Sequence, residues 1–193
     1  AVLLYIIFKN NKIGHACTIL LMLALTITLA DQIASGVCKP YFARFRPTRD
    51  PEIMYLVHTV NAYRGGLYGF ISSHAANTFA VAVFISLLFR YWGATVMMFL
   101  WAIIPSYSRI YLGVHYPGDI LCGALEGCIV GAVVYCGYRY IAKRYFDQPQ
   151  YISDQYTSTG YTINDIRILF ITLLLTYLYA IIAGMIQAKA LYF

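Results

Sequence analysis

The amino-acid sequence predicts an all-α protein, a polytopic transmembrane helix bundle. Of its 193 residues, 61% are hydrophobic and only 11% are charged, whereas charged residues make up about a quarter of an ordinary soluble domain. Apolar runs long enough to cross a bilayer, which takes roughly 20 helical residues, recur along the chain. These observations favour an integral membrane protein of about six helices, with no separate soluble domain.

Five full helices are expected after a partial first one. The chain opens in an apolar run at 1–8, so we expect the first helix to be truncated in this sequence. The five full helices are expected at 16–36, 71–90, 94–112, 117–138 and 166–187. We treat 1–193 as a single membrane-embedded domain, with a motif-bearing core at 16–140 and the helix at 166–187 as a C-terminal addition.

The charge and the cysteines exclude several other classes of protein. The net charge of +6 does not indicate nucleic-acid binding, because Lys and Arg of membrane proteins gather in cytoplasmic loops and near anionic headgroups. The five cysteines form no Cys-x-x-Cys pair and lie mostly in apolar runs, where cysteine acts as a small apolar side chain. Neither a disulfide framework nor a zinc site is predicted.

Three short motifs contain the residue types that bind and transfer phosphate. They are Lys39-x6-Arg46-Pro47, then Ser72-Ser73-His74, and finally Ser108-Arg109 followed by His115 and Asp119. Arginine offers a planar fork that matches phosphate oxygens, and lysine offers a compact positive charge. Ser72 and Ser73 precede a helix start, where they can cap the helix and donate to a phosphate oxygen.

The two histidines are candidates for a nucleophile and an acid. Asp119 can accept a hydrogen bond from one imidazole nitrogen of His115 and leave the other nitrogen free to attack. His74 opens the helix expected at 71–90. No acidic cluster with metal-ligand spacing accompanies the motifs, and cations with helix dipoles can stabilise charge as a metal does elsewhere. We therefore expect a metal-independent phosphoryl transfer without a cofactor.

The expected helices alternate in direction, which sorts the cations onto two sides of a membrane. One side carries seven, namely Lys9, Lys12, Arg90, Arg139, Lys143, Arg144 and Arg167. The other also carries seven, but the three in the motifs leave four, namely Arg44, Arg49, Arg64 and Lys189. Because cytoplasmic loops are richer in Lys and Arg, the motifs are predicted to lie on the extracytoplasmic side.

The motifs resemble those of the type 2 phosphatidic acid phosphatase superfamily, which includes lipid phosphatases and haloperoxidases. The first and third motifs match at every defining position, whereas the second has Ile71-Ser72-Ser73-His74 where the family usually has Pro-Ser-Gly-His. The resemblance implies that His115 forms a phosphohistidine and that Asp119 orients it. It also implies that His74 protonates the leaving oxygen and later activates water. The residues it implies as phosphate ligands are Lys39, Arg46, Ser72 and Arg109.

We expect a membrane lipid phosphatase that hydrolyses a phosphate monoester or pyrophosphate from a lipid headgroup. The expected location is a bacterial inner membrane, with the site on the periplasmic face. The expected partners are a lipid phosphate substrate and membrane lipids, without nucleic acid. Undecaprenyl pyrophosphate or a phosphatidylglycerophosphate-type lipid is the preferred substrate, and a lipid A phosphatase is an alternative. A non-catalytic lipid-binding or transport protein is the rival from another class, and the intact His74, His115 and Asp119 speak against it.

Two acidic residues within expected helices have no assigned role. Asp31 shares a helix face with Ser35 and Lys39 if its helix continues that far. Glu126 lies seven residues after Asp119 on the same face of another helix. Ionisable groups at membrane depth are costly and therefore often functional, and structural pairing inside the bundle is the alternative for both.

Overall fold

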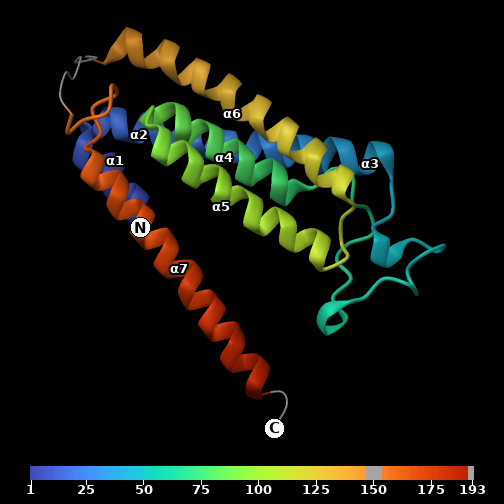
Figure 1. Ribbon diagram of the computed structural model, residues 1–193. Coiled ribbons are helices and arrows are strands. Elements are labelled where there is room, and N and C mark those ends of the chain that lie inside the picture. The colour runs from blue at the N-terminus through green and yellow to red at the C-terminus, as the bar shows by residue number, and fades with distance from the viewer. Residues whose placement is uncertain (147–153, 191–193) are drawn as a thin grey trace.

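The computed structural model describes residues 1–146 and 154–190 as helices joined by loops (Figure 1). The helices are α1 (Val2–Asn10), α2 (Ile13–Asp31), α3 (Lys39–Phe42), α4 (Ser73–Phe89), α5 (Trp92–Tyr111), α6 (Pro117–Tyr145) and α7 (Ile163–Ala190). A π-helical segment, Gln32–Cys38, joins α2 to α3 without a break. The described residues therefore form six helical rods, and the predicted all-α helix bundle is confirmed.

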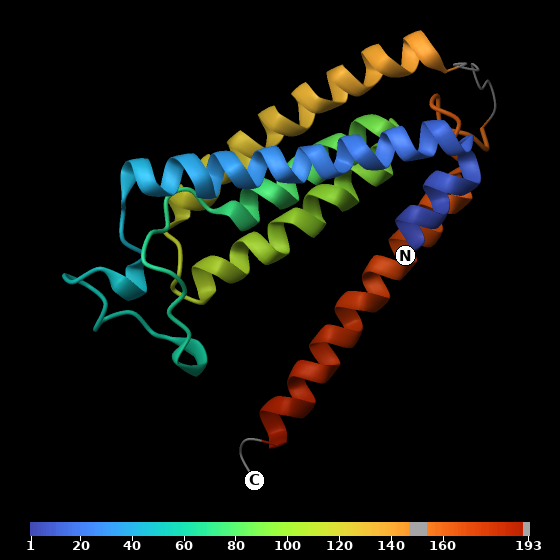
Figure 2. The same cartoon turned by 180° about the vertical axis from the view of Figure 1, so that it is seen from behind.

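Helix α4 lies at the centre of the bundle, and α2, α5 and α6 pack around it (Figures 1 and 2). Its buried residues include Ala75, Ala76, Ala80 and Ala82, each with no exposed surface. Small side chains let neighbouring helix backbones approach closely, which matters in a membrane because lipid tails are as apolar as leucine and hydrophobic burial gains little. The small residues of α4 thus explain its central position.

A line of glycines on α6 makes the closest helix–helix contact. Gly123, Gly127 and Gly131 follow one another at four-residue spacing, so they lie on one face of the helix. A Cβ at these positions would collide with the carbonyl oxygens of Ser72, Ala76 and Ala80, in that order. The backbones of α4 and α6 therefore touch over three successive helical turns, and we call this contact the glycine seam.

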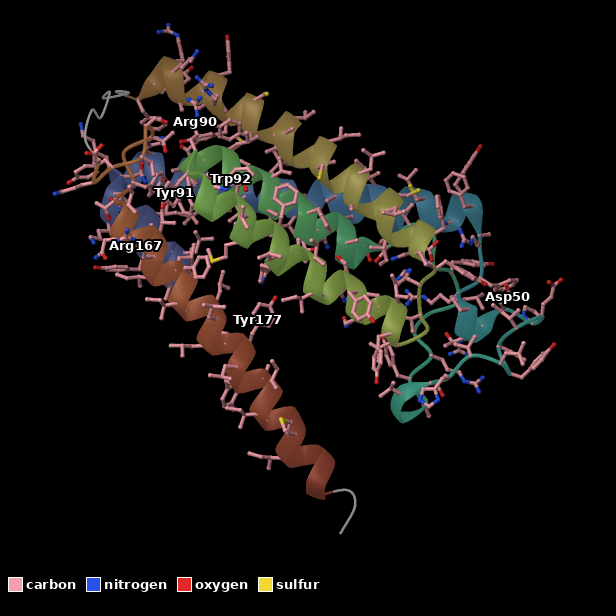
Figure 3. The ribbon with its side chains drawn as sticks, in the orientation of Figure 1. Asp50, Arg90, Tyr91, Trp92, Arg167 and Tyr177 are labelled. Carbon is pink, nitrogen blue, oxygen red and sulfur yellow. The ribbon has the colours of Figure 1, made fainter. Side chains whose placement is uncertain are left out.

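Helix α7 leaves the bundle at an angle (Figure 1). Its first turn is held by α1, because Lys9 Nζ lies 2.6 Å from Asp165 Oδ1. Farther along, the Tyr177 hydroxyl donates to the Trp101 carbonyl oxygen of α5 at 3.2 Å (Figure 3). Only 6% of its most apolar stretch is buried within the protein, so most of this apolar helix is left for lipid to cover.

Three helical rods are long and apolar enough to cross a membrane, namely Ile13–Phe42, Pro117–Tyr145 and Ile163–Ile186. The sequence predicted five such spans. Helix α4 is apolar but has only 17 residues, and the last two turns of α5 carry the polar Ser106, Ser108 and Arg109. Both helices are present where they were expected, although they are too short or too polar to count as spans, and the three other rods make the protein an integral membrane protein.

Several helix ends differ from the prediction, and the two largest differences are at C-terminal ends. The helix expected at 16–36 runs from Ile13 to Phe42, where Ala43 ends it in the left-handed conformation at φ 44°. Lys39, expected just beyond this helix, is therefore part of it. The helix expected at 117–138 continues to Tyr145. Its last two turns are polar, so they were not recognised as part of an apolar span.

The loops gather at the two ends of the bundle. Residues 43–72 and 112–116 lie at one end, where Asp50 is seen in Figure 3. The turns before α2 and α5 and the segment that leads into α7 lie at the opposite end, with Arg90 and Arg167. All three sequence motifs belong to the first of these ends.

Candidate active site

The continued α2–α3 rod positions Lys39. Its Nζ donates to the Ser73 hydroxyl and to the Ser35 hydroxyl, both at 2.9 Å. Ser35 in turn lies 3.4 Å from Asp31 Oδ1, which also accepts from the Asn77 amide at 3.4 Å. The predicted shared face of Asp31, Ser35 and Lys39 is confirmed, and it forms a polar chain that fixes the ammonium group.

Arg46 is fixed by the loop around it. Its backbone N–H donates to the Leu67 carbonyl at 3.1 Å, and its side-chain Nε donates to the Tyr68 carbonyl at 3.1 Å. Gly65, at φ +64°, passes so close that a Cβ there would lie 2.5 Å from Arg46 Nη1. Burial lowers the pKa of the Arg46 guanidinium, which stays cationic because free arginine titrates far above neutrality.

The second motif starts helix α4. Ser72 is fully buried, and its hydroxyl accepts from the Ala75 N–H at 3.4 Å as an N-cap. Its own N–H donates to the Asp119 carbonyl oxygen at 3.0 Å, which ties the starts of α4 and α6 together. Ser73, where the family motif usually has glycine, receives the hydrogen bond from Lys39. The serine pair thus caps a helix and orients a lysine.

The third motif forms a buried histidine–carboxylate pair. His115 Nδ1 lies 3.3 Å from Asp119 Oδ2, and the two residues are 3% and 0% exposed. The same carboxylate oxygen accepts from the Tyr116 N–H at 2.9 Å, which fixes Asp119 in the first turn of α6. With Nδ1–H directed at the carboxylate, Nε2 of His115 is the unprotonated nitrogen.

Burial and neighbouring charges keep His115 neutral. Burial is the largest cause that lowers its pKa, and the positive charges of Arg46 and Lys39 lower it further. The hydrogen bond to Asp119 acts in the opposite direction and raises the pKa. The net shift is downward from the ordinary value, so the imidazole is mainly neutral at pH 7, as a nucleophile requires.

Arg44 is a site residue that the sequence analysis missed. Its Nη1 lies 3.3 Å from Asp119 Oδ1, the carboxylate oxygen that does not face His115. The guanidinium also stacks over the Tyr116 ring, 4.3 Å from the centroid. Asp119 is therefore held from both sides, by His115 and Tyr116 at one oxygen and by Arg44 at the other. Arg44 lies inside the spacer of the first motif, where the pattern specifies no residue.

The remaining site residues complete a positively charged group. Arg109, near the end of α5, is oriented by the Ser108 hydroxyl, which its Nε approaches at 3.2 Å. His74 stands at the start of α4 within electrostatic reach of Arg109, His115, Lys39 and Arg46. The structure therefore brings together every residue that the motifs singled out. Three cations and two imidazoles converge where α4 and α6 begin, and they come from three helices, α3, α4 and α5, and from the loops at 43–72 and 112–116.

Glu126 is not part of this group. Both of its carboxylate oxygens are buried, and neither has a hydrogen-bond partner among the residues that the structure describes. Within the described residues, no group of three or more His, Cys, Asp or Glu side chains is placed to hold a metal ion.

The site combines clustered cations with a buried His–Asp pair at one end of a membrane helix bundle. This combination is typical of a membrane-embedded phosphatase. The PAP2 superfamily matches residues 16–143, and this chain belongs to that superfamily. The family resemblance that the motifs predicted is therefore confirmed. The prediction that the protein is a lipid phosphatase is confirmed as well.

Relatives with known names match most of the chain. It is 42% identical over 152 residues to the lipid A 4'-phosphatase of Bacteroides thetaiotaomicron, covering 77% of this chain and 67% of that protein. It is 40% identical over 144 residues to the lipid A 4'-phosphatase of Porphyromonas gingivalis, covering 74% and 60%. The matched part of the chain thus spans 67% of the length of the first relative and 60% of the length of the second.

The fold also resembles that of a solved structure. A transmembrane PAP2-type phosphatidylglycerolphosphate phosphatase from Bacillus subtilis matches with a TM-score of 0.50 and 24% identity. The match covers 72% of this chain and 66% of that one. At this identity the likeness concerns the fold, and it agrees with the helix bundle described above.

Proposed function

We propose that this protein is a lipid phosphatase that cleaves a phosphate monoester from a membrane lipid through a phosphohistidine intermediate. The observation that carries the proposal is the buried His115–Asp119 pair at 3.3 Å, placed in one site with Lys39, Arg46 and Arg109. A neutral imidazole beside clustered cations suits attack on an anionic phosphate. The same arrangement speaks against a non-catalytic transport or scaffold protein, for which a buried, oriented histidine has no use.

In the first chemical step, His115 Nε2 attacks phosphorus and the bond from phosphorus to the lipid oxygen breaks. His74 gives its proton to that oxygen, so the lipid leaves as an alcohol. Lys39, Arg46 and Arg109 bind the phosphoryl oxygens, whose charge must be stabilised as the group transfers. Ser72 and Ser73 serve the same site from the start of α4, Ser73 by orienting Lys39.

In the second step, His74 takes a proton from water, and the resulting hydroxide attacks phosphorus. The bond from phosphorus to Nε2 breaks, inorganic phosphate leaves, and His115 returns to its neutral form. Asp119 stabilises the positive charge that the imidazole carries while it is phosphorylated, as a buried carboxylate does for a catalytic histidine elsewhere. These residues provide the charge and proton transfers of the cycle without a cofactor.

The first candidate substrate is the 4'-phosphate of lipid A. Two relatives at 42% and 40% identity, each matched over about three quarters of this chain, are named lipid A 4'-phosphatases. The sequence motifs alone favoured undecaprenyl pyrophosphate or a phosphatidylglycerophosphate-type lipid, because they describe only the phosphate site. These lipids become the second candidates.

We place the protein in a bacterial inner membrane with its active site on the periplasmic face. The end opposite to the motifs carries seven Lys and Arg, whereas the motif end carries four besides those of the motifs. This excess supports a cytoplasmic position for the opposite end. Residues 43–72 and 112–116 meet at one end of the bundle, so one orientation applies to all three motifs.

The test is phosphate release by the purified full chain in detergent from lipid A, undecaprenyl pyrophosphate and phosphatidylglycerophosphate, with EDTA present. We expect fastest release from lipid A, and mass spectrometry of the product should show loss of the 4'-phosphate. The His115→Ala protein is the blank. Faster turnover of either other lipid would reverse the order of substrates, and a strict need for added Mg²⁺ would contradict the proposed chemistry.

A further inference from the structure

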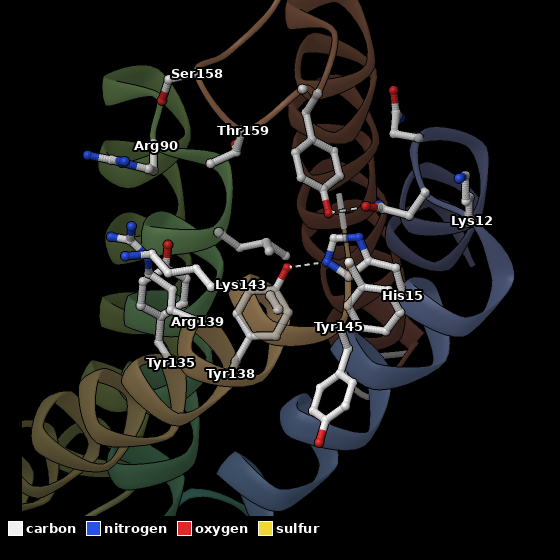
Figure 4. A pocket seen from close by; sticks show the side chains of 17 residues that line it. Lys12, His15, Arg90, Tyr135, Tyr138, Arg139, Lys143, Tyr145, Ser158 and Thr159 are labelled. Carbon is white, nitrogen blue, oxygen red and sulfur yellow. Dashed lines mark hydrogen bonds between the residues drawn. The ribbon is translucent and has the colours of Figure 1, made fainter. Parts of the chain in front are cut away.

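A second polar hollow lies at the end of the bundle opposite to the phosphate site. It is a cavity of about 870 Å³, within the range of small-ligand pockets. Its walls come from the turn between α1 and α2, from the C-terminal ends of α4 and α6, and from residues 158–161 ahead of α7 (Figure 4). We call it the basic pocket, because four cations line it, namely Lys12, Arg90, Arg139 and Lys143.

Aromatic side chains give the basic pocket a fixed wall. His15 Nε2 and the Tyr138 hydroxyl lie 2.8 Å apart in hydrogen-bond contact, and the His15 ring stacks on Phe146 at 4.6 Å (Figure 4). The Asn11 amide donates to the Tyr161 hydroxyl at 3.0 Å. These contacts join three separate segments of the chain, so the wall is built by the fold.

Three cations of the basic pocket, Arg90, Arg139 and Lys143, are not neutralised by carboxylates of the described residues. Arg90, Arg139 and Lys143 are exposed, and none forms an ion pair with a carboxylate of the described ranges 1–146 and 154–190. By contrast Lys9, on the neighbouring helix, is paired with Asp165 at 2.6 Å. In Figure 4, Arg90 and Arg139 lie on one side of the hollow and His15 lies on the other. A site with this charge fits an anion.

The position of the basic pocket along the membrane helices indicates which anion can reach it. Its walls include the first turns of the Ile13–Phe42 span and the last turns of the Pro117–Tyr145 span, so it lies where membrane helices meet the headgroup layer. Lys and Arg at such positions attract anionic lipids. Tyrosine side chains suit the same layer, since the ring is apolar and the hydroxyl is polar.

A general excess of cations on one side of the membrane does not account for this arrangement. The excess of Lys and Arg in cytoplasmic loops depends on the number of these residues, and it does not require their side chains to point into one pocket. Here Arg90 and Arg139 come from different helices and line one hollow together with ordered aromatic rings. Arg144 and Arg167, which also belong to this end, do not line it.

We propose that the basic pocket binds the phosphate of an anionic phospholipid headgroup from the leaflet at this end, with Arg90 and Arg139 as its main ligands. The site lies at the other end of the bundle from His115, so the lipid it holds is not the substrate being hydrolysed. Its phosphate is bound by arginine and its glycerol part lies along the aromatic wall.

The test uses the purified full chain in a neutral detergent and isothermal titration calorimetry. The titrants are dioctanoyl phosphatidylglycerol, dioctanoyl phosphatidylcholine and inorganic phosphate. The pocket variant is Arg90→Gln with Arg139→Gln, and the control variant is Arg144→Gln with Arg167→Gln, which removes the same charge from the same end. An Arg46→Gln protein separates binding at the phosphate site from binding at the basic pocket.

We expect phosphatidylglycerol to bind the unchanged, control and Arg46→Gln proteins about equally, and the pocket variant about tenfold more weakly or worse. Phosphatidylcholine should bind weakly to all of them. Equal affinity of the pocket and control variants would overturn the proposal. Inorganic phosphate that binds as tightly as the lipid, and loses affinity only in the pocket variant, would overturn the lipid in favour of a soluble anion. Phosphatase activity of the pocket and control variants, and the thermal unfolding midpoint of the Arg46→Gln protein, show that each is folded.

Discussion

The two ends of the bundle both gather cations, but they hold them differently. At the phosphate site, Lys39, Arg44 and Arg46 are tied by hydrogen bonds or ion pairs to serine, aspartate and backbone oxygens. In the basic pocket, Arg90 and Arg139 are exposed and have no such partners within the described residues. Fixed charges suit a reaction whose transition state demands one geometry, whereas exposed charges suit a ligand that is only bound.

The largest expected effect tests the chemistry at the first end. His115→Ala should abolish turnover, with a loss of several powers of ten, because no other group in the site is placed to attack. The measurement is phosphate release under saturating lipid, together with the thermal unfolding midpoint to show that the fold is kept. A purified variant with more than about a tenth of the original activity would remove His115 as the nucleophile.

A smaller loss is expected for Asp119→Asn, because the imidazole remains while its tautomer is no longer enforced. This variant also reports on the acid limb of the pH–rate profile. Since the pKa of His115 is lowered by burial and nearby cations, its neutral form persists below the ordinary value of about 6.5. On the acid side of the profile, activity should therefore fall only at pH values below about 6.5.

The direction of the shift in Asp119→Asn follows from the same balance. Asp119 raises the pKa of His115 against the effect of burial. Its neutralisation should lower this pKa further and move the acid limb of kcat/KM to lower pH. A limb that moves to higher pH would contradict the assignment of this limb to His115.

Arg44→Gln should have a moderate effect, a fall in kcat of about tenfold with little change in KM. The ion pair with Asp119 at 3.3 Å is lost, but the partly exposed guanidinium is screened by solvent, which limits its contribution. The matched control is Arg49→Gln, whose guanidinium reaches only the Gly65 carbonyl at 3.3 Å. Equal activities of the two variants would show that Asp119 does not need Arg44.

The smallest effect on activity is expected from a labelling experiment that tests which end of the bundle faces outward. In a cysteine-free background, Thr59→Cys should react with a membrane-impermeant maleimide on spheroplasts, and Ser158→Cys should react only after lysis. These two positions belong to opposite ends of the bundle, and neither change touches the candidate catalytic groups. The reverse labelling pattern would place the phosphate site in the cytoplasm and the basic pocket outside.

The sequence predicted the helices and the grouping of the motif residues at one end of the bundle, for a physical reason. Apolar runs report membrane helices directly, and the site is built from residues close to helix ends, so spacing along the chain translates into position. Even Lys39, expected beyond its helix, kept the face it shares with Asp31 and Ser35. The predicted roles of the site residues remain proposals to be tested by the variants above.

Features that depend on contacts between distant segments were not predictable in this way. Arg44 reaches Asp119 because residues 44–46 pair with residues 67–69, including the bridge between Phe45 and Tyr68. The basic pocket draws its residues from several segments without a common motif. The glycine seam, in contrast, was readable as Gly123-x3-Gly127-x3-Gly131 and was overlooked.

The glycine seam decides which parts of this protein can be exchanged. Backbone contact over three turns prevents α4 from sliding or rolling against α6, and the hydrogen bond from Ser72 N–H to the Asp119 carbonyl closes one end of this contact. This contact therefore fixes the position of His74 relative to His115. Asp50 and Arg64 are tied to this part of the protein through Tyr116 and Thr48. Residues 51–63 between them lie outside the helix contact, so a graft of this stretch from a relative offers a route to new headgroup preference that leaves the reacting atoms in register.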